Sequence, residues 1–444
     1  MVEEVNKPRT ACKIQYVRNK ANQYFLNMKN ILKNRIWTIV LWLVATTSIT
    51  AQDYDLLVKG GHVVDSKNNM DQVMDVAIKD GKIAKVDSKI PESHAKTVID
   101  AKGFLVAPGL LDIHGHNFFG TEEDSYLSNS FTSLPPDGFT FRSGVTTIVD
   151  VGGAGWKNFR TFKKQTIDNS KTRVLSFLNI IGSGMKGGAI EQNIEDMNPK
   201  MTAYVASQYK GTIVGVKLAH YSGFDWEPVN RVVAAGTMAN IPVMIDFGGS
   251  DPELSLETLL MEKLRPGDIF THAYAHVKGR TPVVDENGRV RKFVFEAQNR
   301  GIIFDVGHGG GSFVFEQAVP AMNQGFLPNS ISTDLHTGSM NGGMKDILNI
   351  MSKFINMGMS AKQVIECATW NPAQYIKRTD LGHLTVGAVA DLTILNLRKG
   401  NFGFIDTQGG KMMGDQKLEC ELTLREGVVV WDLNGISRPM WNAK

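Results

Sequence analysis

The organising feature of this chain is Leu110-Leu111-Asp112-Ile113-His114-Gly115-His116, where an apolar run leads directly into two histidines. Side chains two residues apart on a strand point to the same face, so both imidazoles can reach one ion. Histidine is the commonest metal ligand in proteins, and a pair at one strand end is a rigid half of a coordination shell. The stretch therefore indicates a metal site, although two surface histidines beside a turn at Gly115 would give the same pattern.

The composition is that of an ordinary globular protein. The 444 residues are 42% hydrophobic and 21% charged, with a formal net charge of +3. This length allows one large domain and a smaller one. The net charge is small and no dense basic cluster follows the first 35 residues, which indicates no nucleic-acid partner. The three cysteines are too few for a disulfide framework.

Residues 1–52 have the pattern of a targeting segment rather than of a folded element. Basic residues precede the apolar run 36–45, and a stretch of small residues follows it. This is the order of a secretory signal peptide, and the apolar run is too short to span a bilayer. We expect a native start at Met28, cleavage at Ala51 or Gln52, and a secreted or periplasmic enzyme without stable membrane insertion. An uncleaved membrane anchor is the alternative.

Both ends of the remaining chain carry short strand-like runs. Turns separate them, and Asp80-Gly81 is a strong two-residue hairpin signal. The simplest assembly joins residues 53–107 and 378–444 in one small β-sandwich, with the intervening chain as a second, larger domain. The expected strands are 54–58, 62–65, 73–79 and 82–87 at one end and 390–397, 418–425 and 428–431 at the other.

The middle region, residues 108–377, alternates short apolar runs with helical stretches. Such runs, each ending in glycine or polar residues, predict a (β/α)8 TIM barrel, an α/β fold in which all strand ends meet at one mouth. A doubly wound parallel sheet is the alternative, but it cannot gather so many polar strand ends around one site. The runs are 110–113, 146–151, 174–180, 213–218, 241–247, 268–274, 302–306 and 330–335.

Chemically reactive residues lie in or after these runs. The first run supplies the two histidines, the sixth His272 and the eighth Asp334. The fourth run carries Lys217 inside an otherwise apolar strand, where an unpaired ammonium is costly. One interpretation is a buried salt bridge, for which Asp246 at the end of the fifth run is a candidate partner. The other, which we favour, is that CO2 has carboxylated the amine to an anionic carbamate able to bridge two metal ions.

Together these residues resemble the metal-dependent amidohydrolase superfamily, and the likeness covers nearly the whole mature chain. Within the superfamily, the stretch 304–313 resembles the amidohydrolase/deacetylase branch, whose members are similar to dihydroorotases and D-aminoacylases. The motifs that carry the resemblance are 108–116, 143–150, Lys217, His272, Asp334 and 381–392.

The resemblance implies a centre of two zinc or similar divalent ions. Members of the family usually place a histidine on the fifth strand, whereas this chain offers Asp246. A carboxylate oxygen also binds zinc, so Asp246 is a candidate ligand, and a weak or empty second site is the alternative. The implied ligands are His114, His116 and Asp334 for one ion, His272 and Asp246 for the other, and carboxylated Lys217 as the bridge.

Three further histidines follow the sixth, seventh and eighth runs and are candidates for substrate contact. They are His276, His308 and His336. The alternative for each is to orient a ligand carboxylate from outside the coordination shell. The glycines around His308 would allow close approach of a substrate, so contact is favoured there.

These residues predict hydrolysis of an amide or an ester. A metal ion lowers the pKa of its bound water towards neutrality and polarises the carbonyl that the resulting hydroxide attacks. Asp334 is the expected catalytic residue, which accepts the proton and passes it to the leaving group. No serine nucleophile elbow and no phosphate-loop lysine competes for the role.

The substrate is expected to be a small N-acyl or O-acyl compound. Dihydroorotases and allantoinases usually carry an arginine two residues beyond the second metal histidine, where it can hold a substrate carboxylate. This chain has Phe118 there, in an entrance that the sequence predicts to be apolar. A cyclic-amide hydrolase is the main alternative, followed by a deaminase and an inactive binding homologue. The sequence leaves a homo-oligomer open.

Overall fold

The computed structural model describes residues 17–18, 20–33, 52–119, 130, 132–246 and 254–441. The chain divides into two units, residues 1–52 and 53–444. In the first unit, residues 20–33 form an exposed helix, and the apolar run and small residues of the expected signal lie outside the described residues. Within the ranges given above, no helix is long and apolar enough to cross a membrane.

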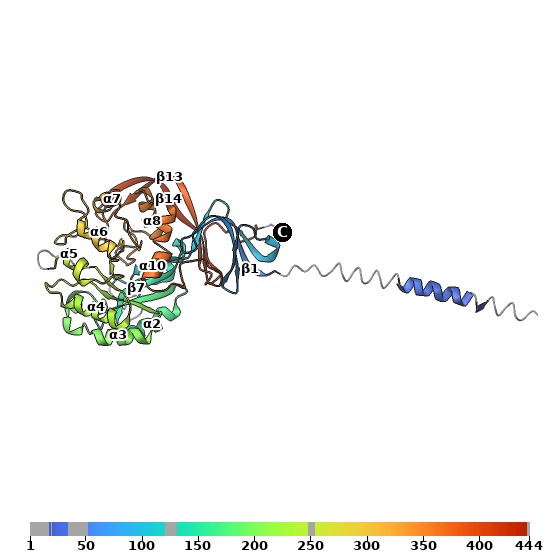
Figure 1. Cartoon of the computed structure of the whole chain (residues 1–444), viewed down its shortest axis with the longest axis horizontal. Coiled ribbons are helices and arrows are strands. Elements are labelled where there is room, and N and C mark those ends of the chain that lie inside the picture. Colours follow the sequence, from blue (N-terminus) through green and yellow to red (C-terminus); the bar gives the residue numbers. More distant parts are fainter. Residues whose placement is uncertain are drawn as a thin grey trace, which may run out of the picture. The chain divides into compact units, whose positions relative to one another are not determined.

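The core of the second unit is a curled parallel sheet, of which Figure 1 labels β7. Its strand order is β12-β11-β10-β9-β8-β7-β6. Every residue of β6, β7, β9 and β10 is buried, as expected for parallel strands covered on both faces. The strands are β6 (Leu110–Gly115), β7 (Val145–Gly155), β8 (Arg173–Asn179), β9 (Ile213–Leu218), β10 (Val243–Ile245), β11 (Ile269–Phe270) and β12 (Ile303–Phe304).

The eighth expected strand is not a regular strand. Residues 330–335 instead form isolated parallel bridges, which pair Ser330 with Asp305 and Leu335 with Gly115. The first bridge lies beside β12 and the second at the end of β6, the two edge strands of the sheet. Seven of the eight predicted runs therefore contain a strand, and β10, β11 and β12 are shorter than the sequence suggested.

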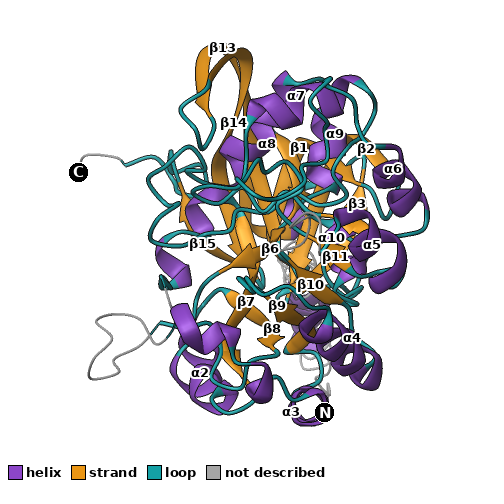
Figure 2. Cartoon of the chain, turned by 90° about the vertical axis from the view of Figure 1, so that its left-hand side faces the viewer, coloured by secondary structure: helices purple, strands orange, loops and turns teal. Residues whose placement is uncertain are grey.

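Helices surround this sheet, as Figure 2 shows. Of these helices, α2, α3, α4 and α10 contact its strands, and α8 is buried along nearly its whole length. The helices are α2 (Phe159–Gln165), α3 (Pro199–Gln208), α4 (Glu227–Ala239), α5 (Leu256–Thr258), α6 (Lys292–Asn299), α7 (Phe315–Asn323), α8 (Ile347–Asn356), α9 (Ala361–Glu366) and α10 (Trp370–Tyr375).

The two ends of the second unit meet in one mixed sheet with the order β15-β14-β13-β5-β1-β2-β3, and β4 pairs with β1. The junction is antiparallel and aligns Ile394 of β13 with Val106 of β5. By its strand pairing, the expected sandwich is thus one continuous sheet. Its strands are β1 (Tyr54–Asp65), β2 (Met70–Lys79), β3 (Lys82–Asp87), β4 (Ala95–Asp100), β5 (Leu105–Pro108), β13 (Leu392–Ile405), β14 (Lys411–Arg425) and β15 (Val428–Asp432).

The hairpin of β13 and β14 is longer than predicted and extends to the loop before α7. The Thr407 hydroxyl donates to the carbonyl of Phe313 over 2.7 Å, and an Asp406 carboxylate oxygen accepts from the Phe315 amide over 3.1 Å. The carboxylate therefore satisfies a backbone donor at the start of α7. The mixed sheet in this way fixes the loop that follows β12.

Candidate metal centre

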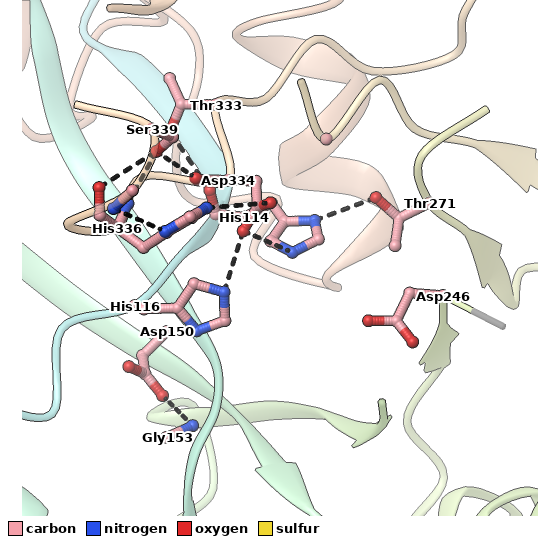
Figure 3. Close-up of polar contacts among 12 residues, drawn as sticks. His114, His116, Asp150, Gly153, Asp246, Thr271, Thr333, Asp334, His336 and Ser339 are labelled. Atoms are coloured by element: carbon pink, nitrogen blue, oxygen red, sulfur yellow. Dashed lines mark hydrogen bonds and ion pairs between the residues drawn. The ribbon is translucent and has the colours of Figure 1, made fainter. Parts of the chain in front are cut away.

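His114 of β6 and His116, which directly follows this strand, meet Asp334 at the ends of the parallel strands (Figure 3). His116 Nε2 lies 2.9 Å from Asp334 Oδ1, and His114 Nε2 lies 3.4 Å from the same oxygen. All three side chains are buried. His114, His272 and Asp334 each offer one ligand atom, and these atoms lie within 4.8 Å of one another. Residues predicted from three different strand ends are therefore brought to one place.

Hydrogen bonds fix how the imidazoles of His114 and His272 present their nitrogens. Thr271 Oγ1 donates to Asp305 Oδ2 over 2.7 Å, so it accepts from His114 Nδ1 at 2.9 Å. His272 Nδ1 lies 2.6 Å from the carbonyl oxygen of Gly307, which can only accept. Both rings thus carry their proton on Nδ1 and leave the Nε2 lone pair free, the form that binds a metal.

Burial keeps these two rings neutral near pH 7. Desolvation lowers the pKa of His114 to about 4 and lowers the pKa of His272 in the same direction. For Asp334, burial alone would raise the pKa, but the neighbouring imidazoles of His114 and His116 outweigh it and hold the pKa well below the usual range. The centre therefore combines neutral nitrogen donors with an ionised carboxylate.

The backbone is strained at two of these residues. His272 has a φ of 60° and Asp334 a φ of 51°, in the left-handed region that side chains other than glycine rarely adopt. Such strain persists only where surrounding contacts hold it, and it concentrates at functional sites. At Asp334 the backbone amide donates to the carbonyl of His114 over 2.7 Å, which fastens the two ligand-bearing segments together.

Lys217 and Asp246 form the other half of the site. Lys217 Nζ is fully buried and lies 3.3 Å from Asp246 Oδ2, but it makes no hydrogen bond within the described chain. His272 Nε2 lies 3.9 Å from the same oxygen. Burial would raise the pKa of Asp246, but the adjacent Lys217 and nearby imidazoles lower it below its usual range. The predicted ion pair of Lys217 and Asp246 is thus present, and His272 lies between this half of the site and His114 with Asp334.

These donors fit a divalent cation. Unprotonated imidazole nitrogen and carboxylate oxygen are the ligands that zinc and similar ions take. A buried amine without a hydrogen bond is costly, so Lys217 also fits a site that holds a further charged group. The residues present are therefore those that a metal centre requires.

The three histidines predicted to contact substrate lie in different surroundings. His336 Nε2 is 3.8 Å from Asp334 Oδ2, so it borders the centre. His276 is exposed and lies 3.7 Å from Glu316. His308 is fully buried, with Nε2 2.6 Å from Lys353 Nζ and Nδ1 3.0 Å from the Gly309 carbonyl. Because both of its ring nitrogens are engaged, this arrangement does not support the predicted substrate contact of His308.

The predicted apolar entrance is also wrong. Phe118 is fully buried and packs on Phe162 with ring centroids 4.9 Å apart. The backbone amides of Asn117 and Phe118 donate to Asp150 over 2.6 and 3.1 Å, which turns this segment into the core. The pocket beside the centre is lined instead by Asp246, His272, Val277, Arg280, Val283 and Ser312, among others.

Sequence reasoning missed the residues that support the ligands. Asp305 accepts hydrogen bonds from Thr271, Ser330 and Ser332 and orients His114 through Thr271. Asp150 holds the loop after His116 through backbone amides. The one signal in the sequence was a carboxylate at the end of an apolar run, which does not say what the carboxylate binds.

Comparison with known proteins identifies the family. The Amidohydrolase family matches residues 315–430. A deacetylase from Brucella anthropi is 33% identical over 347 residues, which cover 76% of this chain and 83% of the relative. The chain belongs to the amidohydrolase superfamily. As an amidohydrolase it is a hydrolase of carbon–nitrogen bonds, in a family that generally depends on divalent metal ions.

Two solved structures extend the comparison to most of the amidohydrolase chain. An adenine deaminase superposes with a TM-score of 0.77 and 28% identity, over 86% of this chain and all of the other. A dihydroorotase superposes with a TM-score of 0.73 and 29% identity, over 85% of this chain and 99% of the other. The resemblance predicted from the sequence is confirmed, while the different activities of these proteins leave the substrate open.

Proposed function

We propose that this amidohydrolase cleaves the amide or ester bond of a small N-acyl or O-acyl compound. The observation that carries the proposal is the convergence of His114, His272 and Asp334 at the strand ends, with ligand atoms within 4.8 Å of one another. The relative named a deacetylase supports an acyl substrate. The solved dihydroorotase favours a second candidate, the opening of a cyclic amide.

We also propose that the curled sheet is a complete (β/α)8 barrel that residues 330–335 close. The Val306 amide donates to the Ser330 carbonyl over 3.1 Å, and the His116 amide donates to the Leu335 carbonyl over 2.9 Å. These bonds link the segment to both edges of the sheet and bring Asp334 to the mouth. A crystal structure in which the segment pairs with one edge alone would contradict closure.

The expected ligands fall into two groups. His114, His116 and Asp334 would hold one zinc or similar ion, and His272 and Asp246 a second, with Lys217 carboxylated between them. Bound divalent ions supply Lewis acidity, which polarises a carbonyl and makes water easier to deprotonate. The 3.9 Å between His272 Nε2 and Asp246 Oδ2, together with the unsatisfied Lys217 amine, supports the second group.

Asp334 is the residue that moves the proton. Its Oδ1 faces His114 and His116, whereas Oδ2 lies 3.8 Å from His336 Nε2. The carboxylate accepts a proton from the attacking water and returns it to the departing nitrogen or oxygen. Thr271 and Asp305 keep His114 in the tautomer that leaves Nε2 free during this transfer.

An assay of acyl release tests the proposed function. N-acetyl amino acids, O-acetyl hydroxy acids and dihydroorotate are offered to the wild-type enzyme and to Asp334→Asn, and free acetate and ring-opened product are measured. We expect acetate release by the wild type and a loss of about 10²–10⁴-fold in the variant, the range of general acid–base catalysis. Ring opening without acetate release would favour the cyclic-amide hydrolase instead.

We propose export of the enzyme with removal of its leader. The support is the order of charged, apolar and small residues before position 52. Expression from Met28 in a secretion-competent host should give a mature N-terminus near Gln52, measured by intact-mass spectrometry of the exported protein. An exported protein that retains the whole leader would show that it is an anchor.

A further inference from the structure

His220 is a histidine beside the Lys217 and Asp246 half of the centre that the sequence left without a role. It lies two residues beyond the end of β9, and its backbone amide donates to Asp246 Oδ1 over 3.2 Å. Asp246 is therefore in contact with Lys217 through Oδ2 and with the backbone of His220 through Oδ1. The backbone of His220 therefore contacts the carboxylate that stands where the family usually has its fifth-strand histidine.

A buried carboxylate sets the protonation of this imidazole. His220 Nδ1 lies 2.7 Å from Glu191 Oε2, and Oε1 of Glu191 accepts from the Gly187 amide over 2.7 Å. The Glu191 side chain is only 1% exposed, and these two donors satisfy its buried oxygens. The carboxylate can only accept, so Nδ1 carries the proton in this contact and Nε2 is the nitrogen left to face an ion, while the same contact raises the pKa of His220.

This arrangement matches that of the two ligand histidines. His114 and His272 also direct Nδ1–H to an oxygen and leave Nε2 unprotonated. His308 shows that the match is selective, because Lys353 occupies its Nε2. The side chain of His220 is 49% exposed, and within the ranges that the structure describes no hydrogen bond engages its Nε2. Metal-binding histidines commonly donate their other ring N–H to a carboxylate in this way.

The backbone gives a second, independent sign. His220 has a φ of 55°, close to the values of His272 and Asp334. His220 and His272 each lie two residues beyond the end of a strand of the parallel sheet, β9 and β11, and all three residues adopt a conformation that favours glycine. Strain of this kind is retained where it positions a functional side chain.

We propose that His220 is a metal ligand of the second ion and supplies through Nε2 the imidazole that the fifth strand no longer provides. Glu191 is its positioning residue. This inference rests on the two-ion centre of the proposed function, and it assigns the ion a donor set of His220, His272 and Asp246 together with Lys217. The segment after β9 would thus supply a histidine in place of the one that the family usually has on the fifth strand.

Metal titration of three variants tests the assignment without substrate. Chelated enzyme is titrated with Zn²⁺ and Co²⁺, and bound ions are counted by mass spectrometry while the visible absorption of Co²⁺ is followed. The wild type should bind two ions. His220→Ala should bind one ion tightly, with its affinity for the second weakened by at least about 100-fold. Glu191→Gln should weaken the affinity for the second ion by about 10–100-fold. His94→Ala is the matched control, because His94 Nδ1 also contacts a carboxylate, Asp53 Oδ2 at 2.9 Å, and His94 lies just before β4, outside the parallel sheet.

The outcomes separate this inference from the proposed function. Loss of one ion in His220→Ala, with both retained in His94→Ala, supports ligation. Two ions bound by His220→Ala with unchanged affinity and an unchanged Co²⁺ spectrum overturn it and reduce the His220–Glu191 contact to a structural ion pair. A wild type that binds a single ion also overturns it, while acetate release in the assay above would still support the hydrolase.

Discussion

Lys217 and Lys353 are both fully buried lysines near the same centre, but their surroundings differ. Lys353 Nζ, on α8, lies 2.6 Å from His308 Nε2 and 2.8 Å from the carbonyl of Gly343, so neutral acceptors satisfy it. Lys217 Nζ, on β9, faces a carboxylate at 3.3 Å and makes no hydrogen bond within the described chain. A satisfied buried amine stabilises the fold, whereas an unsatisfied one marks a place that another group completes.

The two lysines also differ in the residues that they contact. Lys353 fixes His308, and the neighbouring Gly307 carbonyl accepts from His272 Nδ1, so this lysine supports the centre from outside. Burial lowers the pKa of Lys353 to about 7, because the nearby carboxylates of Asp406 and Asp346 only partly offset the desolvation of its ammonium. Lys217 instead lies within the strand end itself, beside Asp246 and His272. We therefore expect substitution of Lys217 to affect chemistry and substitution of Lys353 to affect stability.

The largest effect is expected from Lys217→Ala. Loss of a bridging anion leaves two cations uncompensated, so we expect most bound metal to be lost. The several kcal/mol that a Lewis acid contributes correspond to a fall in kcat/KM of about 10³-fold or more. Metal content and acetate release measure both effects. A variant with full metal content and full rate would show that Lys217 has no bridging role and only forms a salt bridge.

The next effect concerns Asp246 and separates ligation from simple ion pairing. As a ligand, Asp246 can be replaced by His with metal retained, while Asp246→Ala loses the second ion. If Asp246 only pairs with an uncarboxylated Lys217, either substitution leaves the Lys217 ammonium buried without its partner, at a cost of roughly 3–5 kcal/mol. We expect a stable, metal-loaded Asp246→His protein. The metal content and melting temperature of both variants distinguish ligation from ion pairing. Equal instability of the two variants would favour the salt bridge.

The smallest effect is expected from Lys353→Met and shows in the pH dependence of stability. The pKa of Lys353 is about 7 when folded and near 10.5 when unfolded, so the unfolded chain binds more protons between these values. Stability of the metal-free wild type should therefore rise with pH, with this lysine contributing about 2 kcal/mol between pH 7 and 9. Urea unfolding of both proteins at the two pH values measures it. An equal rise in Lys353→Met would assign the effect to other groups.

The sequence predicted the features that depend on the residue pattern of a single strand. The strands β6 to β9 were predicted because buried parallel strands are continuous apolar runs, and the histidine pair at the end of β6 followed from the two-residue period of a strand. The meeting of His114, His272 and Asp334 also followed, because parallel strand ends gather at one edge.

Contacts between distant segments could not be predicted in this way. His308 was expected to be open to substrate, but Lys353, 45 residues away on α8, engages it. Phe118 was expected at the entrance, but it packs on Phe162 of α2. The Glu191 that orients His220 lies 29 residues earlier, in the short 3-10 helix Gly188–Gln192. Such pairs depend on how loops fold over the strand ends, which hydrophobic patterns do not encode.

The central claim is that the centre at His114, His272 and Asp334 requires a metal ion for hydrolysis. The most direct test removes metal with a chelator, adds back Zn²⁺ in steps, and measures bound zinc and acetate release on the same samples. We expect hydrolysis to vanish with the metal and to return in proportion to bound zinc. Hydrolysis at an undiminished rate by protein shown to be free of metal would contradict the account.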